Sequence, residues 1–138
     1  MGWALAKLPL SIRTPAPMKL HYIANQHVVP SSGDSIPVID PSTGEQFDAI
    51  ARGNAADIDL AVQAAREAFN GAWGRLTATE RGRLLQRLSQ HMLANIDELA
   101  AIESRDCGKP TTLARGDVTA VARYFEFYAG AADKLMGE

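Results

Sequence analysis

The sequence predicts an α/β fold in which short strands and hairpins over residues 20–51 are followed by three α-helices, at about 54–70, 77–107 and 113–136. Two observations support this prediction. β-branched residues in short runs, separated by asparagine, serine, proline and glycine, fill the first region, and such runs are typical of strands joined by turns. Beyond residue 54, apolar residues recur instead at spacings of three and four, which is the period of an amphipathic helix.

Composition limits the kinds of partner. A chain of 138 residues with 46% hydrophobic and 22% charged residues is typical of a soluble globular domain. Its net charge of −2 leaves no basic surplus to neutralise phosphates, so we expect no nucleic-acid partner. No apolar run approaches the roughly 20 residues that cross a bilayer, so we expect no membrane span. One cysteine cannot form an internal disulfide, and a cytoplasmic location is the default expectation.

The first 17 residues look separate from the domain. They contain lysine and arginine but no acidic residue, and three prolines interrupt them. The lack of acids is compatible with a transit peptide, but the apolar run is too short for a good secretory signal. We expect residues 1–17 to be a disordered extension, or to follow a start codon placed too early, and residues 18–138 to hold the folded part.

The strand region divides into two parts. The pattern from Leu20 to Val29 predicts a hairpin of two short strands with Asn25-Gln26 between them. Glycine usually follows asparagine in such a tight turn, whereas here glutamine does. A second strand over Ile36–Ile39 stops at the turn-forming run Asp40–Gly44, and Phe47 begins another short strand that continues to residue 51.

The first predicted helix begins at Asn54, which can cap it, with Asp57 in its first turn, where a carboxylate meets the positive end of the helix dipole. Its apolar stripe is predicted to be buried, and Gly71 follows its last residue. The members of this stripe are Ile58, Ala61, Val62, Ala65 and Phe69.

The second predicted helix is the longest element. Thr77 and Glu80 have the spacing of a capping box, while Gly108 and Pro110 favour termination. The residues between them place one apolar face toward a core, which predicts a single helix of about eight turns. That face consists of Leu84, Leu85, Leu88, Met92, Ile96, Leu99 and Ile102.

The third predicted helix contains two glycines, Gly116 and Gly130, each of which weakens a helix by up to about 1 kcal/mol relative to alanine. We therefore expect this helix to start late, or to pack unusually close to a neighbour. Its predicted apolar side is formed by Val118, Val121, Ala122, Phe125, Tyr128, Ala129, Ala132 and Leu135.

Several segments in a fixed order resemble a known family. The second helix opens with T-x-x-E-R-G-R-L-L and ends with E-L-A-A-I-E-S-R-D-C-G-K-P. Further matching segments are Tyr22–Asn25, Asp40–Glu45, Arg115–Val118 and Tyr128–Lys134. Together they cover roughly residues 20–138 and resemble the N-terminal part of the aldehyde dehydrogenase superfamily.

The resemblance implies an aldehyde dehydrogenase-like fold and NAD(P)-dependent oxidation of an aldehyde to a carboxylate. In that family a cysteine thiolate attacks the carbonyl, hydride passes to the nicotinamide, and a glutamate activates water. The strand region belongs to a small sheet that reaches a neighbouring subunit in many members, which implies a homo-oligomer for the complete protein.

The sequence contains none of the family's cofactor-binding segments, nucleophile loop or general-base motif. We therefore expect an N-terminal fragment that is inactive alone and binds neither NAD nor NADP. An independent helical protein-interaction module is the alternative.

Cys107 is the only cysteine, but it lies in the D-x-G-K-P turn, whereas the family's nucleophile lies far downstream. No histidine is tied to it as a base, so we expect a structural residue. Lys109 is expected to be solvated or capping rather than a phosphate ligand, because no glycine-rich loop accompanies it. The histidines show no metal-ligand spacing. We thus assign no catalytic and no cofactor-binding residue.

Four residues receive a role through the resemblance. Asp106, with a backbone carbonyl near Val38, helps hold a structural monovalent cation in several family members; the alternative is an aspartate that bonds the local turn. The face of the third helix that carries Ala120 and Tyr124 flanks the substrate tunnel. The alternative for Tyr124 and its aromatic neighbours is core packing, since their spacing is helical.

Overall fold

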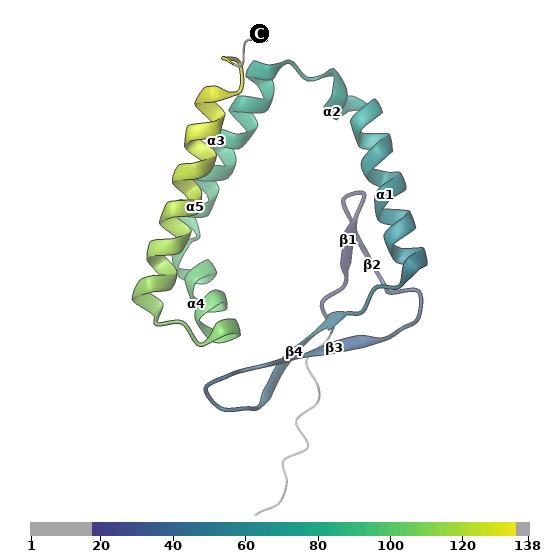
Figure 1. The fold of residues 1–138 in the computed structure, drawn as a ribbon, viewed down its shortest axis with the longest axis vertical. Coiled ribbons are helices and arrows are strands. Elements are labelled where there is room, and N and C mark those ends of the chain that lie inside the picture. The colour runs from purple at the N-terminus through teal and green to yellow at the C-terminus, as the bar shows by residue number, and fades with distance from the viewer. Residues whose placement is uncertain (1–17, 135–138) are drawn as a thin grey trace, which may run out of the picture.

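The computed structural model describes residues 18–134. Within this range the chain forms two separate antiparallel hairpins followed by five helices (Figure 1). The α/β fold class is thereby confirmed. The predicted extension at residues 1–17 lies outside the described residues. The predicted end of the third helix near Met136 is wrong, because that helix ends at Ala131 and residues 132–134 are not helical.

The first hairpin pairs β1 (His21–Ile23) with β2 (Gln26–Val28). Its two turn residues are Ala24 and Asn25, with φ values of 52° and 61°, rather than the predicted pair Asn25-Gln26. Asparagine tolerates this left-handed conformation well, and it occupies the second turn position. The hairpin was therefore predicted correctly, with the turn placed one residue too late.

The second hairpin pairs β3 (Ser35–Ile39) with β4 (Gln46–Ala51), as predicted. A short extended segment at Lys19 adds to β4, because the Lys19 amide donates to the Ala49 carbonyl (2.7 Å) and the Ala51 amide donates to the Lys19 carbonyl (2.8 Å).

The predicted capping of α1 (Ala55–Asn70) is present. The Asn54 side chain accepts from the Ala56 and Asp57 amides, and the Asp57 carboxylate accepts from the Asn54 amide at 2.9 Å. A short helix, α2 (Ala72–Arg75), which the sequence did not predict, leads to the next element.

The long second helix is divided at Asn95 into α3 (Ala78–Ala94) and α4 (Ile96–Cys107). Asn95 has φ −113° and ψ 23°, and its side-chain amide donates to the His91 carbonyl at 2.8 Å. A side chain that bonds a nearby carbonyl competes with the regular helix. The prediction of one continuous helix was therefore wrong at this residue.

The two predicted ends of this pair of helices are confirmed. Thr77 and Glu80 form the capping box, with the Glu80 carboxylate 2.7 Å from the Thr77 amide. Gly108 ends α4 in the left-handed conformation, with φ 70°. The last helix, α5 (Thr111–Ala131), begins directly after Pro110, earlier than predicted and upstream of Gly116.

Glycine permits a close helix contact, but at a different residue from those predicted. A Cβ atom on Gly82 of α3 would lie 2.6 Å from the Ala129 carbonyl oxygen of α5, whereas Cβ atoms on Gly116 and Gly130 would meet nothing within 4 Å. The close approach therefore lies at Gly82.

The elements enclose an open centre (Figure 1). α5 lies beside α3 and α4 on one side, and α1 and α2 form the other side, with the β1–β2 hairpin beside α1. The β3–β4 hairpin lies between these sides at the lower end. Within residues 18–134, the buried apolar cluster is small and consists mainly of Ala100, Ala114 and Val118 from α4 and α5. No large side chain in this range is fully buried.

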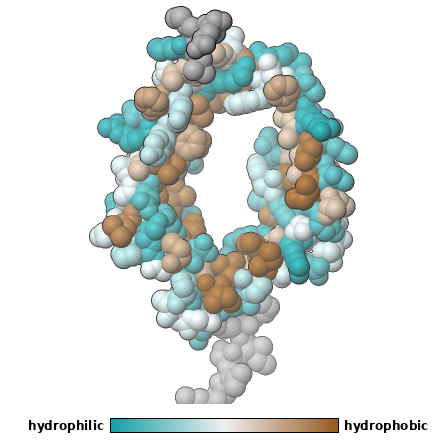
Figure 2. All heavy atoms as spheres, viewed as in Figure 1, coloured by the Kyte–Doolittle hydropathy of each residue, from teal (hydrophilic) through white to brown (hydrophobic). Residues whose placement is uncertain are grey.

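Much of the predicted apolar surface is exposed. On α1, Ile58 and Val62 are exposed, and Phe69 retains 72% of its accessible surface. Leu88 of α3 and Ile102 of α4, also predicted to be buried, are exposed. Figure 2 shows hydrophobic side chains on both sides of the central opening and along its lower rim. In the described part of the chain, no helix is both long enough and apolar enough to span a membrane.

Candidate functional site on α4 and α5

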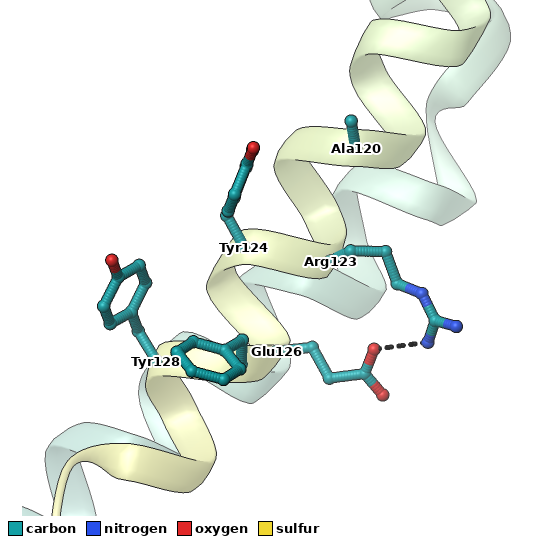
Figure 3. Close-up of a pocket in the computed structure, with 6 residues that line it drawn as sticks. Ala120, Arg123, Tyr124, Glu126 and Tyr128 are labelled. Atoms are coloured by element: carbon teal, nitrogen blue, oxygen red, sulfur yellow. Dashed lines mark hydrogen bonds and ion pairs between the residues drawn. The ribbon is translucent and has the colours of Figure 1, made fainter.

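One face of α5 carries an open apolar pocket of about 700 Å³. It is lined by Ala120, Arg123, Tyr124, Glu126, Phe127 and Tyr128. In Figure 3, Tyr124 and Tyr128 project to the same side of the helix, and Ala120 lies one turn from Tyr124. Both residues that the sequence assigned to the substrate tunnel, Ala120 and Tyr124, therefore line one surface.

The aromatic residues of this pocket are largely exposed. Tyr124 retains 65% of its accessible surface, Phe127 69% and Tyr128 60%, and the Phe127 and Tyr128 rings meet edge to face with centroids 5.3 Å apart. The alternative of core packing is therefore wrong for these three residues in this chain, whereas Phe125 is half-buried. Helical spacing could not distinguish a core from an uncovered apolar face, because both have the same period.

The charged groups at the edge of this pocket neutralise each other. The Arg123 guanidinium donates to the Glu126 carboxylate at 2.7 Å (Figure 3). The pocket therefore exposes aromatic rings and the small Ala120 side chain, and the pair of Arg123 and Glu126 adds no net charge to it.

A second pocket of about 520 Å³ lies between the β3–β4 hairpin and α4. Val38 and Asp106, which the sequence assigned to a monovalent cation, both line it. Lys19 and Arg105 line it too, so cationic side chains share the pocket with the carboxylates of Asp48 and Asp106. Among residues 18–134, no group of three or more histidine, cysteine, aspartate or glutamate side chains gathers as a metal site.

Arg105 ties α4 to the β3–β4 hairpin, a role that the sequence analysis missed. Its guanidinium carbon lies 4.2 Å from the centre of the Phe47 ring, and its Nε lies 3.7 Å from the Asp40 carboxylate. Hydrogen bonds from the Ser42 hydroxyl and amide, together with Arg105, lower the pKa of Asp40. Because residues 40 and 105 are far apart in sequence, no local pattern could reveal this contact.

Lys109 joins two carboxylates rather than facing solvent or capping a helix as expected. Its ammonium group contacts Glu103 of α4 and Asp117 of α5. The hydrogen bonds from Asp117 and Glu103 raise the pKa of Lys109. This lysine is therefore engaged in a link between helices.

Cys107 lies at the end of α4, where its thiol donates to the Glu103 carbonyl at 3.0 Å. This is a local helix contact, and no histidine or lysine contact to the sulfur accompanies it within the described range. The geometry agrees with a structural role and gives no sign of an activated nucleophile.

The N-termini of α1 and α3 are already occupied by side chains of the chain itself. A pyrophosphate binds the free amides of a helix N-terminus behind a glycine-rich turn. At α1 and α3 the Asn54 and Thr77 side chains accept from first-turn amides, and Asp57 and Glu80 place a carboxylate beside them. Lys109, close to the start of α5, is already bound by two carboxylates.

Residues 28–138 match the profile of the aldehyde dehydrogenase family. Aldehyde dehydrogenase family 2 member C4 of Arabidopsis thaliana is 42% identical over 119 residues, which cover 85% of this chain and 24% of the relative.

Solved structures give the same result. A candidate aldehyde dehydrogenase from Burkholderia cenocepacia is 59% identical with a TM-score of 0.85, over 86% of this chain and 25% of that protein. The NAD-dependent aldehyde dehydrogenase from Sinorhizobium meliloti is 34% identical with a TM-score of 0.84, over 89% of this chain and 25% of that protein.

The hairpins and helices thus have an aldehyde dehydrogenase-like arrangement. The chain belongs to the aldehyde dehydrogenase family, which confirms the resemblance found in its sequence. It corresponds to an N-terminal segment and spans about a quarter of the length of these relatives. The alternative of an independent helical interaction module gains no support from these comparisons.

Proposed function

We propose that this chain is part of an oxidoreductase that converts an aldehyde to a carboxylate with NAD or NADP. The match of residues 28–138 to the aldehyde dehydrogenase family carries this proposal. The Sinorhizobium meliloti relative is NAD-dependent, which supports a nicotinamide cofactor for the complete protein. The same family match supports an aldehyde as the substrate of the complete protein.

Within that protein, the segment contributes a wall of the substrate passage through α5. The exposed aromatic face around Ala120 and Tyr124 supports this assignment, because an apolar surface that is uncovered here is available to line a passage. The segment by itself carries out no turnover. Covalent catalysis needs a nucleophile beside oxyanion donors, and the loss of a single donor typically reduces the rate by about 10²- to 10³-fold.

A chimeric enzyme tests this proposal. Residues 18–134 replace the corresponding segment of the Burkholderia cenocepacia protein, which is 59% identical over the aligned region. NADH formation is measured with a panel of aldehydes in the parent and in the chimera. We expect the chimera to keep the turnover of the parent, and the isolated 138-residue chain to show neither turnover nor saturable NAD or NADP binding in calorimetric titration.

A pair of variants tests the role of α5. Tyr124→Ala in the chimera should change kcat/KM by about 10-fold for at least one aldehyde, the order expected when a side chain that contacts substrate is lost. Tyr22→Ala is the matched control, since Tyr22 is equally exposed but lies on β1. A folded chimera without aldehyde turnover would contradict the enzymatic proposal, and equal effects of the two variants would contradict the assignment of Tyr124.

The remaining assignments also concern the complete protein, which we propose is a cytoplasmic homo-oligomer. A structural monovalent cation held by Asp106 and a carbonyl near Val38 stays a prediction. The shared pocket supports it. Lys19 and Arg105 oppose it, because like charges repel a bound cation.

A further inference from the structure

A polar contact unrelated to the proposed function links the first hairpin to α1. His21 is the first residue of β1, and Asp57 lies in the first turn of α1. The His21 Nε2 atom is 3.9 Å from the Asp57 carboxylate, and the two side chains retain 22% and 6% of their accessible surface.

Asp57 is held in place as a carboxylate by backbone donors. The Asn54 amide donates to one of its oxygens at 2.9 Å and the Ser31 amide donates to the other at 3.0 Å. These two bonds lower the pKa of Asp57, with the Asn54 amide as the larger cause. A buried negative charge therefore lies beside the imidazole at neutral and mildly acidic pH.

The His21 Nε2 atom is buried and has no hydrogen-bond partner among the described residues. A distance of 3.9 Å is too long for a hydrogen bond from a neutral imidazole. It is short enough for electrostatic attraction between an imidazolium and a carboxylate that are partly shielded from water. Protonation therefore adds an interaction that the neutral side chain lacks.

The backbone leaves room for this arrangement at Gly53. A Cβ atom on Gly53 would lie 3.3 Å from His21 Cε1 and 3.4 Å from Nε2, which is tight contact. The absence of a side chain at Gly53 lets the imidazole lie against the backbone that precedes α1.

Three titratable groups of the neighbouring elements are accounted for by their position or by another contact. His27 of β2 contacts Tyr22, and because strand residues alternate between faces, it lies on the opposite face from His21. Lys19 pairs with Asp48 at 3.8 Å. Glu67 lies almost three turns along α1 from Asp57.

We propose that protonation of His21 clamps the β1–β2 hairpin onto α1 through Asp57, so that the hairpin is held more firmly at mildly acidic than at mildly alkaline pH. A pocket of about 540 Å³ lies between these two elements. The side of α1 that faces it carries mostly alanine, namely Ala61, Ala64, Ala65 and Ala68. Because alanine offers little apolar area to hold the hairpin, the contact between His21 and Asp57 decides how firmly this pocket is closed.

Amide hydrogen exchange in the full 138-residue chain tests the clamp. After correction for the intrinsic pH dependence of exchange, protection of the amides of residues 21–28 should be roughly threefold higher at pH 5.5 than at pH 8, the scale of a partly exposed ion pair. His21→Asn should abolish this difference. His27→Asn, which removes the other hairpin histidine, should preserve it. An unchanged difference in His21→Asn, or no difference in the unmodified chain, overturns the proposal.

A second measurement needs no variant. In a nuclear magnetic resonance titration of the unmodified chain, the amide signals of Ser31 and Asn54, which both donate to Asp57, should shift with the same midpoint as the His21 imidazole. Amide shifts that follow only His27, or that stay constant while His21 titrates, contradict the proposal. This readout also covers the case in which His21→Asn does not fold.

Discussion

Lys109 shows how a single side chain can connect two helices through charge as well as through their apolar contact. It lies in the short turn between α4 and α5, and its ammonium group reaches Glu103 behind it and Asp117 ahead of it. Ser104 strengthens the same turn, since its hydroxyl donates to the Lys109 carbonyl at 2.6 Å. The turn is thus held by both the backbone and the side chain of Lys109.

Lys109→Met should lower the urea midpoint of unfolding at pH 7, because it leaves two carboxylates close together without their cation. Asp117 and Glu103 raise the pKa of Lys109 above its ordinary value. The stability that depends on this charge is fully present below the pKa of an unfolded lysine, about 10.4, and is lost as pH rises through the raised folded value. The difference between the unmodified chain and Lys109→Met should therefore stay constant from pH 6 to 9 and shrink at higher pH.

Lys134→Met is the matched control for this experiment. Lys134 pairs with the adjacent Asp133, but its side chain retains 71% of its accessible surface, against 30% for Lys109. Exposed pairs contribute little to stability. Equal effects of the two substitutions at pH 7 would show that the two-carboxylate link does not stabilise the fold.

Contacts between residues close in sequence could be predicted, and contacts between distant residues could not. The caps at Asn54 and Thr77 were found because helix-capping partners lie three residues apart. The pairing of Arg105 with Asp40 depends on how α4 lies against a hairpin. No spacing rule describes such a pairing, because the intervening chain can take many paths.

At the scale of elements, the contact between α3 and α5 depends on the absence of a side chain at Gly82. Gly82 is buried and faces the backbone of α5 at Ala129, while Ala132 lies nearby. Helices that approach through small residues bring their backbones close together, so any added atom must move one helix.

Gly82→Ala should destabilise the chain although alanine favours helix. The helix preference stabilises by up to about 1 kcal/mol, whereas overpacking a close contact costs about 1–3 kcal/mol. The control is Gly116→Ala in α5, where a new Cβ meets nothing within 4 Å; it should stabilise by about 0.5–1 kcal/mol. Urea unfolding followed by circular dichroism measures both. A stabilised Gly82→Ala variant would mean that α3 and α5 separate easily.

The boundary between α3 and α4 at Asn95 shows that apolar spacing alone does not predict where one helix ends and the next begins. Apolar spacing continues across Asn95, so the pattern alone predicted one helix. The signal for a second start was present in Asn95 followed by Asp97 and Glu98, acidic residues in the first turn of a helix. This local signal identifies the break, whereas the directions that the two helices take depend on their packing against α5.

At the scale of the whole molecule, the exposed apolar faces exceed the buried core. Phe69 of α1 and the aromatic face of α5 are uncovered, while the cluster between α4 and α5 consists mainly of alanine and valine. Large uncovered apolar patches on soluble chains mark surfaces that associate. The same periodic sequence would produce a buried face in a longer protein, so exposure could not be predicted from it.

The purified chain should therefore self-associate and bind a hydrophobic dye. Sedimentation velocity should show species larger than a monomer that increase with concentration. Phe69→Ser should shift this distribution toward the monomer, while Gln63→Ser, an exposed polar position on the same helix, should not. A compact monomer without dye binding would show that the uncovered faces do not drive association.

The contact of Arg105 with Asp40 and Phe47 also has a consequence for chain topology. It closes a loop in which the two ends, Asp40 and Arg105, are 65 positions apart in the sequence. This loop runs through α1, α2 and α3 and returns along α4. The entropy lost on closing a flexible loop grows only with the logarithm of its length, so that doubling the length costs about 0.6 kcal/mol. The stretch around α2, at the far end of this loop, can therefore gain residues at little cost in closure entropy, whereas a substitution of Arg105 removes one of the contacts that close the loop whatever its length.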